Sequence, residues 1–593
     1  MDTNGERREA VGWGRMALAV SAVLGLQVAL CVQGIDLTDE GFWASFYQSI
    51  FVSPSSVKYG FMYWLTGVVG GAWLKAFPSL GVLGLRLLSV GCQTITMALA
   101  WYVLRPFVRH ASLGWGFLAG VVLIHNNILS FYANPFSALL LMASVACAWR
   151  FLRCLRLRWL VLSGAVVGLA VFARTPNILG VAGVSIPLLA LLLKRPWSWR
   201  TAGRWCVCYV AGFAGGVVVT VGAMAALGHV SLFLDALRLL SEMGAGKGDQ
   251  AHHSAGALVL HQLRVYGLTG VLALLGLAGA GGGGWFFARL AERMGPRAAR
   301  TLSGAAAWGM AACLSYGFVR YSAMGLVYYV ALAVGLSMAV HECMVLRVPA
   351  DRAVAWWSAL LLVLVLPLGS NVPHFIGRYA LWLLLPLSVD GLRKLGGVRE
   401  AGARTDSSCA QVCWPRLFCA AALAGVFIAS AVLTVQQPYR DSQTRARLSA
   451  PLRTDQTLGL LTTPERAAVL SDLLQRLRPD VKPGDCLLAY ADMPMVHVLT
   501  DTRPALENAW PKLYAPDVFG KKLSAVAGRN GRLPAVLRQL TNLGMSEWPL
   551  QPVPYLDAPS NLARTALLDH YLKSNGYTCK WQTDHFDFWV APN

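Results

Sequence analysis

The sequence predicts a polytopic α-helical membrane protein with a small α/β domain at its C-terminal end. Of its 593 residues, 56% are hydrophobic and only 14% are charged, whereas soluble domains carry about 25% charged residues. Apolar runs recur along residues 1–435, and runs of about 18 residues or more are long enough to cross a bilayer as helices. Residues 436–593 return to an ordinary soluble composition.

The positive charge is concentrated in the apolar part of the chain. Residues 1–435 contain 33 Lys and Arg against 15 Asp and Glu, while residues 436–593 contain 18 against 15. Basic residues gather in cytoplasmic loops because they orient membrane helices. The net charge of +21 therefore indicates a membrane protein rather than a nucleic-acid-binding one.

About thirteen membrane-spanning helices are expected, beginning with the N-terminus in the cytoplasm. The expected spans are residues 12–33, 82–104, 115–131, 136–152, 159–173, 177–193, 205–227, 264–288, 302–319, 322–343, 354–369, 376–392 and 415–435. This topology places 24 of the 33 basic residues inside and nine outside, as the positive-inside rule requires. The predicted location is the inner cell membrane, with the C-terminal domain in the periplasm.

Two outer segments are long enough to carry structure of their own, residues 34–80 and residues 228–260. In the first, the apolar pieces near 42–52 and 60–76 are too short or too interrupted to span. They are predicted to lie at the membrane interface, where aromatic side chains act as anchors. The expected anchors are Trp43, Tyr47, Tyr63 and Trp64.

The C-terminal domain, residues 436–593, has alternating helix and strand signals. Helices are expected at 464–478 and 561–575, a buried strand at Cys486 to Tyr490, and a closing hairpin at 577–582 and 586–590. Cys486 and Cys579 are the only cysteines of this domain, and the sequence leaves a disulfide between them open.

Three carboxylates directly follow the first predicted span: Asp36, Asp39 and Glu40. Such a cluster at the membrane surface suits a general base, or a carboxylate that assists a divalent metal ion. The alternative is a solvated loop in which Asp39 caps a helix over 40–50. Burial beside Phe42 and Trp43 favours a raised pKa for Asp39, which suits a base.

Cationic and polar residues form further candidate sites on the outer side. Arg174 ends the fifth span, either as a phosphate-binding group or as a snorkelling side chain. Asn371, His374 and Arg378 lie between the eleventh and twelfth spans and suit phosphate or sugar binding, although a simple loop fits equally well. His252 and His253 make a poor metal site, because adjacent histidines on a helix diverge, and an acceptor-facing loop is the preferred interpretation.

Several segments resemble the GT-C superfamily of polyprenyl-phosphate-dependent glycosyltransferases, near the protein mannosyltransferase and aminoarabinose transferase branch. After the Asp39–Glu40 pair come Lys58 to Leu65 (KYGFMYWL), Gly84 to Ser89 (GLRLLS) and Gly164 to Arg174 (GAVVGLAVFAR). These resemble "PPLYYWL", "ALRLPS" and the first part of "GLxLGLAxLTKGP". Arg174 replaces the usual lysine, the proline pair is absent, and Asn134 stands where an acidic residue is common.

The resemblance implies transfer of a sugar from a polyprenyl-phosphate donor to a glycan, lipid or protein acceptor, with inversion. It assigns the base to Asp39, the second acidic position to Glu40, and donor-phosphate binding to cationic groups such as Arg174, Arg378 and Lys58. The resemblance implies no particular cofactor, and a divalent metal ion is compatible with the acidic pair. The alternatives are a lipid-linked sugar flippase or transporter, an O-antigen ligase or polymerase with a lipid-pyrophosphate donor, and a non-catalytic assembly factor.

Overall fold

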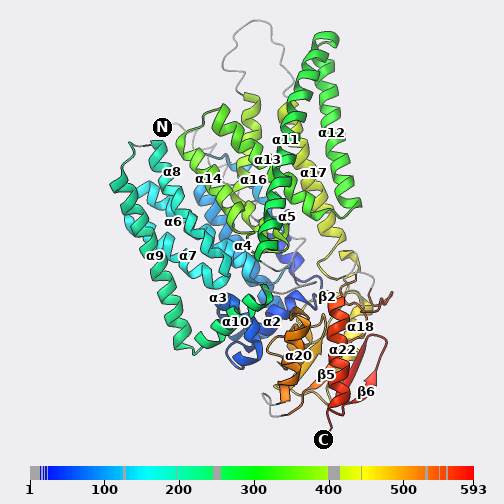
Figure 1. The fold of residues 1–593 in the computed structure, drawn as a ribbon. Helices are drawn as coiled ribbons and strands as arrows, with labels where there is room; N and C mark the ends of the chain where they lie inside the picture. Colours follow the sequence, from blue (N-terminus) through cyan, green and yellow to red (C-terminus); the bar gives the residue numbers. More distant parts are fainter. Residues whose placement is uncertain are drawn as a thin grey trace.

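The computed structural model is a long helical bundle with a mixed α/β region at one end (Figure 1). It describes residues 14, 18, 21, 22, 24–124, 128–194, 196–244, 255–397, 414–441, 444–527, 532–545, 548–555 and 559–592. In Figure 1 the chain finishes at the bottom, in the α/β region. The predicted fold class, helical membrane protein plus C-terminal α/β region, is confirmed.

Each predicted span from the second to the thirteenth has a helical counterpart. The helices are α4 (Gly81–Leu104), α5 (His110–Ile124), α6 (Ala133–Cys154), α7 (Leu157–Ala173), η3 with α8 (Thr175–Val184, Ser185–Lys194), α9 (Trp199–Ala226), α11 (Ala255–Met294), α12 (Pro296–Arg320), α13 (Met324–Val340), α14 (Ala350–Val365), α16 (Leu381–Gly397) and α17 (Trp414–Gln436). Among the described residues, nine helices are long and apolar enough to span a membrane, and α5 and α7 are shorter apolar helices. In the first predicted span, residues 14, 18, 21, 22 and 24–31 are helical, and the other residues of 12–23 lie outside the described part of the chain.

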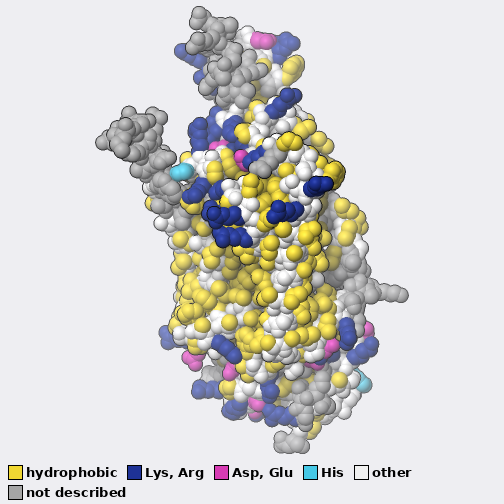
Figure 2. Space-filling view, turned by 90° about the vertical axis from the view of Figure 1, so that its left-hand side faces the viewer, with side chains coloured by type: hydrophobic (Ala, Val, Ile, Leu, Met, Phe, Trp, Pro, Cys, Tyr) yellow, Lys and Arg dark blue, Asp and Glu magenta, His cyan; other side chains and the backbone are white. Residues whose placement is uncertain are grey.

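The surface of the bundle matches this assignment. Figure 2 shows a broad apolar band around the middle of the molecule, with Lys and Arg side chains gathered above it and charges of both signs below. Side chains such as Val218, Val219 and Leu274 are two-thirds exposed on the helices of this band. Apolar side chains that face outwards over the length of a helix are expected where the surrounding solvent is lipid.

Close packing of α7 on α9 depends on glycine. A Cβ atom at Gly164 would lie 2.0 Å from the carbonyl oxygen of Tyr209, and one at Gly212 would lie 1.9 Å from that of Val161. Gly168 and Gly216 repeat the contact one turn further along each helix. Small residues four apart let membrane helices approach at backbone distance, so any larger side chain here would separate the two helices.

The first outer segment folds at the lower end of the bundle into α2 (Asp39–Ser49), η1 (Pro54–Tyr63), α3 (Trp64–Ala76) and η2 (Pro78–Leu80). Its aromatic residues are not interfacial anchors as predicted: Trp43, Tyr47 and Trp64 are 6%, 1% and 2% exposed. Trp64 donates to Nδ1 of His229 and Tyr47 donates to the carbonyl of Phe131. These rings therefore hold the segment against the bundle.

The described parts of the second outer segment, 228–244 and 255–260, are largely helical rather than a loop. They contain α10 (Val230–Gly244), which packs against η1, and the start of α11. His252 and His253 lie outside the described residues.

The C-terminal α/β region is built around a five-stranded sheet. Its main elements are α18 (Pro464–Leu477), β3 (Cys486–Tyr490), α19 (Met495–Thr500), β4 (Arg503–Pro504), α20 (Pro516–Ser524), β5 (Ala535–Gln539), α22 (Pro559–Ser574), β6 (Thr578–Gln582) and β7 (Phe586–Val590), preceded by the pair β1 (Ala450–Pro451) and β2 (Leu461–Thr462). The strand order is β4-β3-β5-β7-β6. β3 runs parallel to β4 and β5, and β7 runs antiparallel to β5 and β6.

The predicted helices, buried strand and closing hairpin of this region are all present. Leu487 and Leu537, on the central strands, are fully buried. Cys486 and Cys579 are not joined by a disulfide.

Candidate functional site

The acidic segment after the first span forms the start of α2, and its three carboxylates have different surroundings. Asp36 acts as the helix cap: Oδ1 accepts from the backbone N–H of Thr38 at 2.9 Å, and Oδ2 accepts from that of Glu40 at 3.0 Å. The alternative in which Asp39 caps the helix is therefore wrong. Asp39 is the first residue of α2, with its side chain directed away from these N–H groups.

Glu40 is held in a buried ion pair with Arg86 of α4. Both guanidinium-to-carboxylate contacts are short, 2.7 Å from Nε to Oε1 and 2.6 Å from Nη2 to Oε2. Arg86 also donates to the carbonyls of Cys31, Gln33 and Gly34. Because Arg86 occupies both oxygens, Glu40 fixes the acidic segment to the bundle rather than offering a carboxylate to a substrate.

Asp39 is the carboxylate that stays accessible, with 22% of its side chain exposed. Its Oδ2 accepts a hydrogen bond from the Tyr439 hydroxyl at 2.7 Å and lies 3.2 Å from Nη2 of Arg440. Burial raises the pKa of Asp39 to about 6; Arg440 opposes this rise and the charge of Asp36 adds to it. The direction agrees with the sequence prediction, and a carboxylate with this pKa is ionised near neutral pH yet basic enough to accept a proton.

An aromatic cluster lies beside Asp39. The rings of Trp43 and Tyr63 are 4.9 Å apart, and those of Trp43 and Tyr132 are 6.0 Å apart. Tyr132 donates a hydrogen bond to the hydroxyl of Tyr379 at 3.2 Å. Tyr132 is also within electrostatic range of Asp39.

Arg174 and Arg378 approach the same tyrosines from other parts of the chain. Arg174 is 5% exposed and donates to the carbonyls of Leu366 and Leu368, at 2.6 and 2.7 Å. Its guanidinium therefore points into the protein, which rules out the snorkelling alternative. Tyr132 lies within electrostatic range of both arginines.

Arg378 is 1% exposed, lies 4.9 Å from the ring centre of Phe375, and donates to the carbonyl of Leu123. Asp39, Arg174 and Arg378 are therefore three predicted site residues that the fold gathers around Tyr132. Tyr63 belongs to the quoted segment Lys58 to Leu65. Tyr132, Tyr379, Tyr439 and Arg440 belong to none of the quoted motifs, and only long-range packing brings them together.

The other predicted site residues that the structure describes are Lys58, His374 and Asn371. Lys58 lies between Asp235 of α10 and Glu507 of the α/β region, at 3.4 and 3.2 Å, so its charge is already compensated. His374 is half-buried between the rings of Tyr329 and Phe375, within electrostatic range of Arg378, and Asn371 is exposed.

The acidic pair does not fit a divalent metal ion. Arg86 takes both oxygens of Glu40, and Arg440 presents a positive charge to Asp39. Within the described residues, no group of three or more His, Cys, Asp or Glu side chains is arranged to hold one.

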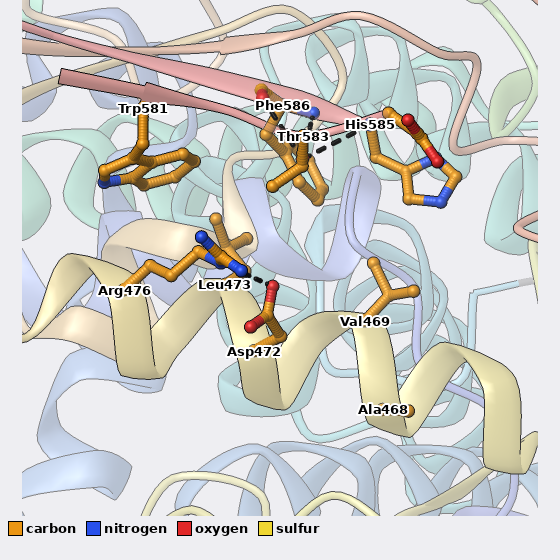
Figure 3. Close-up of a pocket in the computed structure, with 10 residues that line it drawn as sticks. Ala468, Val469, Asp472, Leu473, Arg476, Trp581, Thr583, His585 and Phe586 are labelled. Carbon is orange, nitrogen blue, oxygen red and sulfur yellow. Dashed lines mark hydrogen bonds and ion pairs between the residues drawn. The ribbon is translucent and has the colours of Figure 1, made fainter.

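A separate cavity of about 350 Å³ lies in the α/β region, between α18 and the β6–β7 hairpin (Figure 3). Its lining residues are Ala468, Val469, Asp472, Leu473, Arg476, Trp581, Thr583, Asp584, His585 and Phe586. Asp472 and Arg476 form an ion pair at 2.7 Å on its helical side. It contains none of the residues around Asp39.

The fold and these contacts define a multi-pass α-helical membrane protein with an acidic and cationic centre at one end. No family model matches the sequence, and no curated protein matches it. Two crystal structures of ArnT from Cupriavidus metallidurans are similar at 12% identity. The apo state has a TM-score of 0.48 and covers 98% of both chains; the form bound to undecaprenyl phosphate has a TM-score of 0.45 and covers 97% of this chain and 98% of its own.

Proposed function

We propose that this protein is a membrane glycosyltransferase of the GT-C type. It transfers a sugar from a polyprenyl-phosphate donor to a glycan, lipid or protein acceptor on the extracytoplasmic face, with inversion at the anomeric carbon. Asp39 is the general base, and Arg174 and Arg378 hold the donor phosphate.

The observation that carries this proposal is the buried charge of Arg174. Its described partners are the two backbone carbonyls of Leu366 and Leu368, and no described carboxylate forms an ion pair with it. A guanidinium has five N–H donors, of which these bonds use two. A buried cation without a counter-ion is costly, and a bound phosphate would supply both the missing charge and acceptors for the remaining donors.

The chemistry follows from the two kinds of group. Asp39 removes the proton of the acceptor hydroxyl as its oxygen attacks the anomeric carbon. The bond from that carbon to the phosphate oxygen breaks, and polyprenyl phosphate leaves with one additional negative charge. Arg174 and Arg378 stabilise this charge as it develops, in a site where low water content strengthens the interaction. Attack from the face opposite the phosphate inverts the anomeric carbon.

The orientation in the membrane is inferred from charge. Figure 2 displays the Lys and Arg side chains gathered above the apolar band, at the end opposite the α/β region. The positive-inside rule then assigns the upper end to the cytoplasm and the α/β region with Asp39 to the outer face. A donor anchored by its polyprenyl chain would reach this centre from the outer leaflet.

The decisive test is the donor class. Purified protein in nanodiscs should release polyprenyl phosphate from a panel of polyprenyl-phosphate sugars, in the presence of envelope lipids and glycans extracted from cells that lack this chain. A matched panel of polyprenyl-pyrophosphate glycans should give no product. Turnover of the pyrophosphate panel alone would indicate a ligase or polymerase, and movement of donor across proteoliposomes without chemical change would indicate a flippase.

A further inference from the structure

The α/β region grips the acidic segment on both sides of Asp39. Asp441 accepts from the backbone N–H of Ile35 at 2.6 Å, and Leu461 exchanges backbone hydrogen bonds of 2.8 Å with Val32 and Gly34. Further along, the N–H of Met495 donates to the carbonyl of Leu37 at 3.0 Å. Figure 1 places α2 and the α/β region side by side at the lower end of the bundle.

The fit is close on the helical side as well. A Cβ atom at Gly41 would lie 2.2 Å from the backbone nitrogen of Met495, and Ser45 donates to the carbonyl of Pro494 at 3.1 Å. The two parts therefore meet at backbone distance within two residues of Asp39, so a shift in one displaces the other.

The same region also contacts the Asp39 carboxylate, and it does so at one oxygen. The hydroxyl of Tyr439 and Nη2 of Arg440 both approach Oδ2, at 2.7 and 3.2 Å. No hydrogen bond from a described residue reaches Oδ1. The carboxylate is thus held by one oxygen and open at the other.

Arg440 is itself held in place on several sides. Its Nη1 donates to the hydroxyl of Thr38, and its guanidinium carbon lies 5.8 Å from the ring centre of Trp510. The indole N–H of Trp510 donates to Asp492 at 2.9 Å, and Lys512 binds the other oxygen of Asp492, also at 2.9 Å. The guanidinium therefore keeps one direction relative to Asp39 although its side chain is 37% exposed.

We propose that Tyr439 and Arg440 are positioning residues of the transfer reaction: they hold Oδ2 of Asp39 so that Oδ1 faces the acceptor hydroxyl. The inference rests on the proposed role of Asp39 as the base. It gives the α/β region a direct part in the chemistry, because the residues that aim the base follow the last membrane helix.

The charges that face Asp39 give this arrangement a measurable signature. Arg440 favours the ionised carboxylate, whereas the charges of Asp36 and Asp492 disfavour it, and Tyr439 favours it through the hydrogen bond. Removal of Arg440 leaves the two carboxylates unopposed and raises the pKa of Asp39 further. A base works in its ionised form, so the acid limb of the activity profile moves to higher pH.

The test is the pH dependence of kcat/KM between pH 5 and 9 for Arg440→Gln, Arg440→Lys and Tyr439→Phe, with the donor and extract described above. Opposite charges within about 4–6 Å change a carboxylate pKa by about 1–3 units, and the partial exposure of Arg440 favours the lower end. We expect a shift of about one pH unit for Arg440→Gln, most of it restored in Arg440→Lys, and a smaller shift for Tyr439→Phe. Arg447→Gln, which breaks an exposed pair with Glu465, is the matched control and should leave the profile unchanged.

An unshifted acid limb in Arg440→Gln would overturn the proposal, whether activity is normal or uniformly low. Donor binding by each variant, measured separately, reports whether the protein is folded. Failure of the proposed function has a different signature: Asp39→Asn would then retain turnover. An inactive Asp39→Asn together with an unshifted Arg440→Gln would leave Asp39 as the base and remove only the positioning role.

Discussion

Two buried clusters of charge lie at opposite ends of the helical bundle, and they are built differently. At the upper end, Arg352 pairs with Glu342 through two nitrogens, one contact being 2.6 Å from Nη2 to Oε1, and with Asp390 at 2.8 Å. The indole N–H of Trp356 donates to Glu342 at 2.8 Å, and Lys394 lies 3.9 Å from both carboxylates. Every carboxylate and guanidinium in this cluster has a charged partner.

At the lower end, Arg174 is not matched in this way. Its described partners are carbonyl groups only, whereas Asp39 pairs with Arg440 through Oδ2 and keeps Oδ1 open. Matched charges satisfy one another and fix the segments that carry them, here the turn His341–Val345 after α13, and helices α14 and α16. A buried cation without a counter-ion is costly, and a ligand would satisfy it. On the proposed function, the upper cluster is structural and the lower one binds substrate.

The largest expected effect is on turnover, and it comes from Asp39. Loss of a general base typically costs about 10²–10⁴ in rate. We expect Asp39→Asn to insert, fold and bind the polyprenyl-phosphate sugar, yet to lose at least about 10²-fold in kcat. The measurement separates donor binding from product formation on purified protein.

Asp235→Asn is the matched control for this variant, since it neutralises a partly exposed carboxylate of α10 that pairs with Lys58 and Arg238. It should keep near-normal turnover. Near-normal turnover by Asp39→Asn itself would place the base elsewhere and remove the distinction between the two clusters.

The second effect tests the structural cluster. Breaking a buried ion pair typically costs about 3–5 kcal/mol, and Glu342→Gln should fall near the lower limit because Arg352 keeps Asp390. Thermal unfolding in detergent micelles should show this loss, while the donor affinity of the folded protein stays normal. Asp351→Asn, which breaks the exposed pair with Lys194, should cost less than about 1 kcal/mol. A change in donor affinity without a change in stability would mean that the upper cluster is also functional.

The smallest effect concerns Arg174. A hydrogen bond to a charged group contributes about 1.5–3 kcal/mol, so Arg174→Ala should weaken donor binding about 10- to 150-fold. Arg174→Lys should recover part of the affinity, because lysine keeps the charge but not the planar fork. Equilibrium binding of a polyprenyl-phosphate sugar, compared with the uncharged polyprenol, checks this. Equal affinity of wild type and Arg174→Ala would show that the guanidinium serves only to bind the carbonyls of Leu366 and Leu368.

The membrane helices could be predicted because each has a local signal in the sequence. An apolar run and its flanking charges are sufficient to place a span, and the α/β region gave equally local signals at 464–477 and 486–490. The outer segments were less predictable. Residues 230–244 were predicted as part of a polar loop, but they form α10, which packs against η1. A local sequence pattern does not show which distant segment a helix packs against.

The site was predictable only in part, for the same reason. Asp39, Arg174 and Arg378 each carried a signal, namely a charge at the end of an apolar run. Asp36, Asp39 and Glu40 have different surroundings because their partners differ. Asp36 binds backbone N–H groups of its own turn. The partners of Asp39 and Glu40 lie far away in the sequence. Arg86 is the only charged residue of the predicted span 82–104, but the pattern does not say that its partner is Glu40.

The hydrogen bonds between the α/β region and the acidic segment can form only late in the synthesis of the chain. The hydrogen bond from Ile35 to Asp441 closes a loop of 406 residues. At about 5–20 residues per second, the ribosome would need roughly 20–80 s to synthesise the chain from Ile35 to Asp441. The acidic segment is therefore made long before the α/β region that binds it. The membrane helices from α4 to α17 are synthesised in that interval, while Asp39 has neither Tyr439 nor Arg440 beside it. If Asp39 is the base, as proposed, the nascent protein would stay inactive until the α/β region has folded.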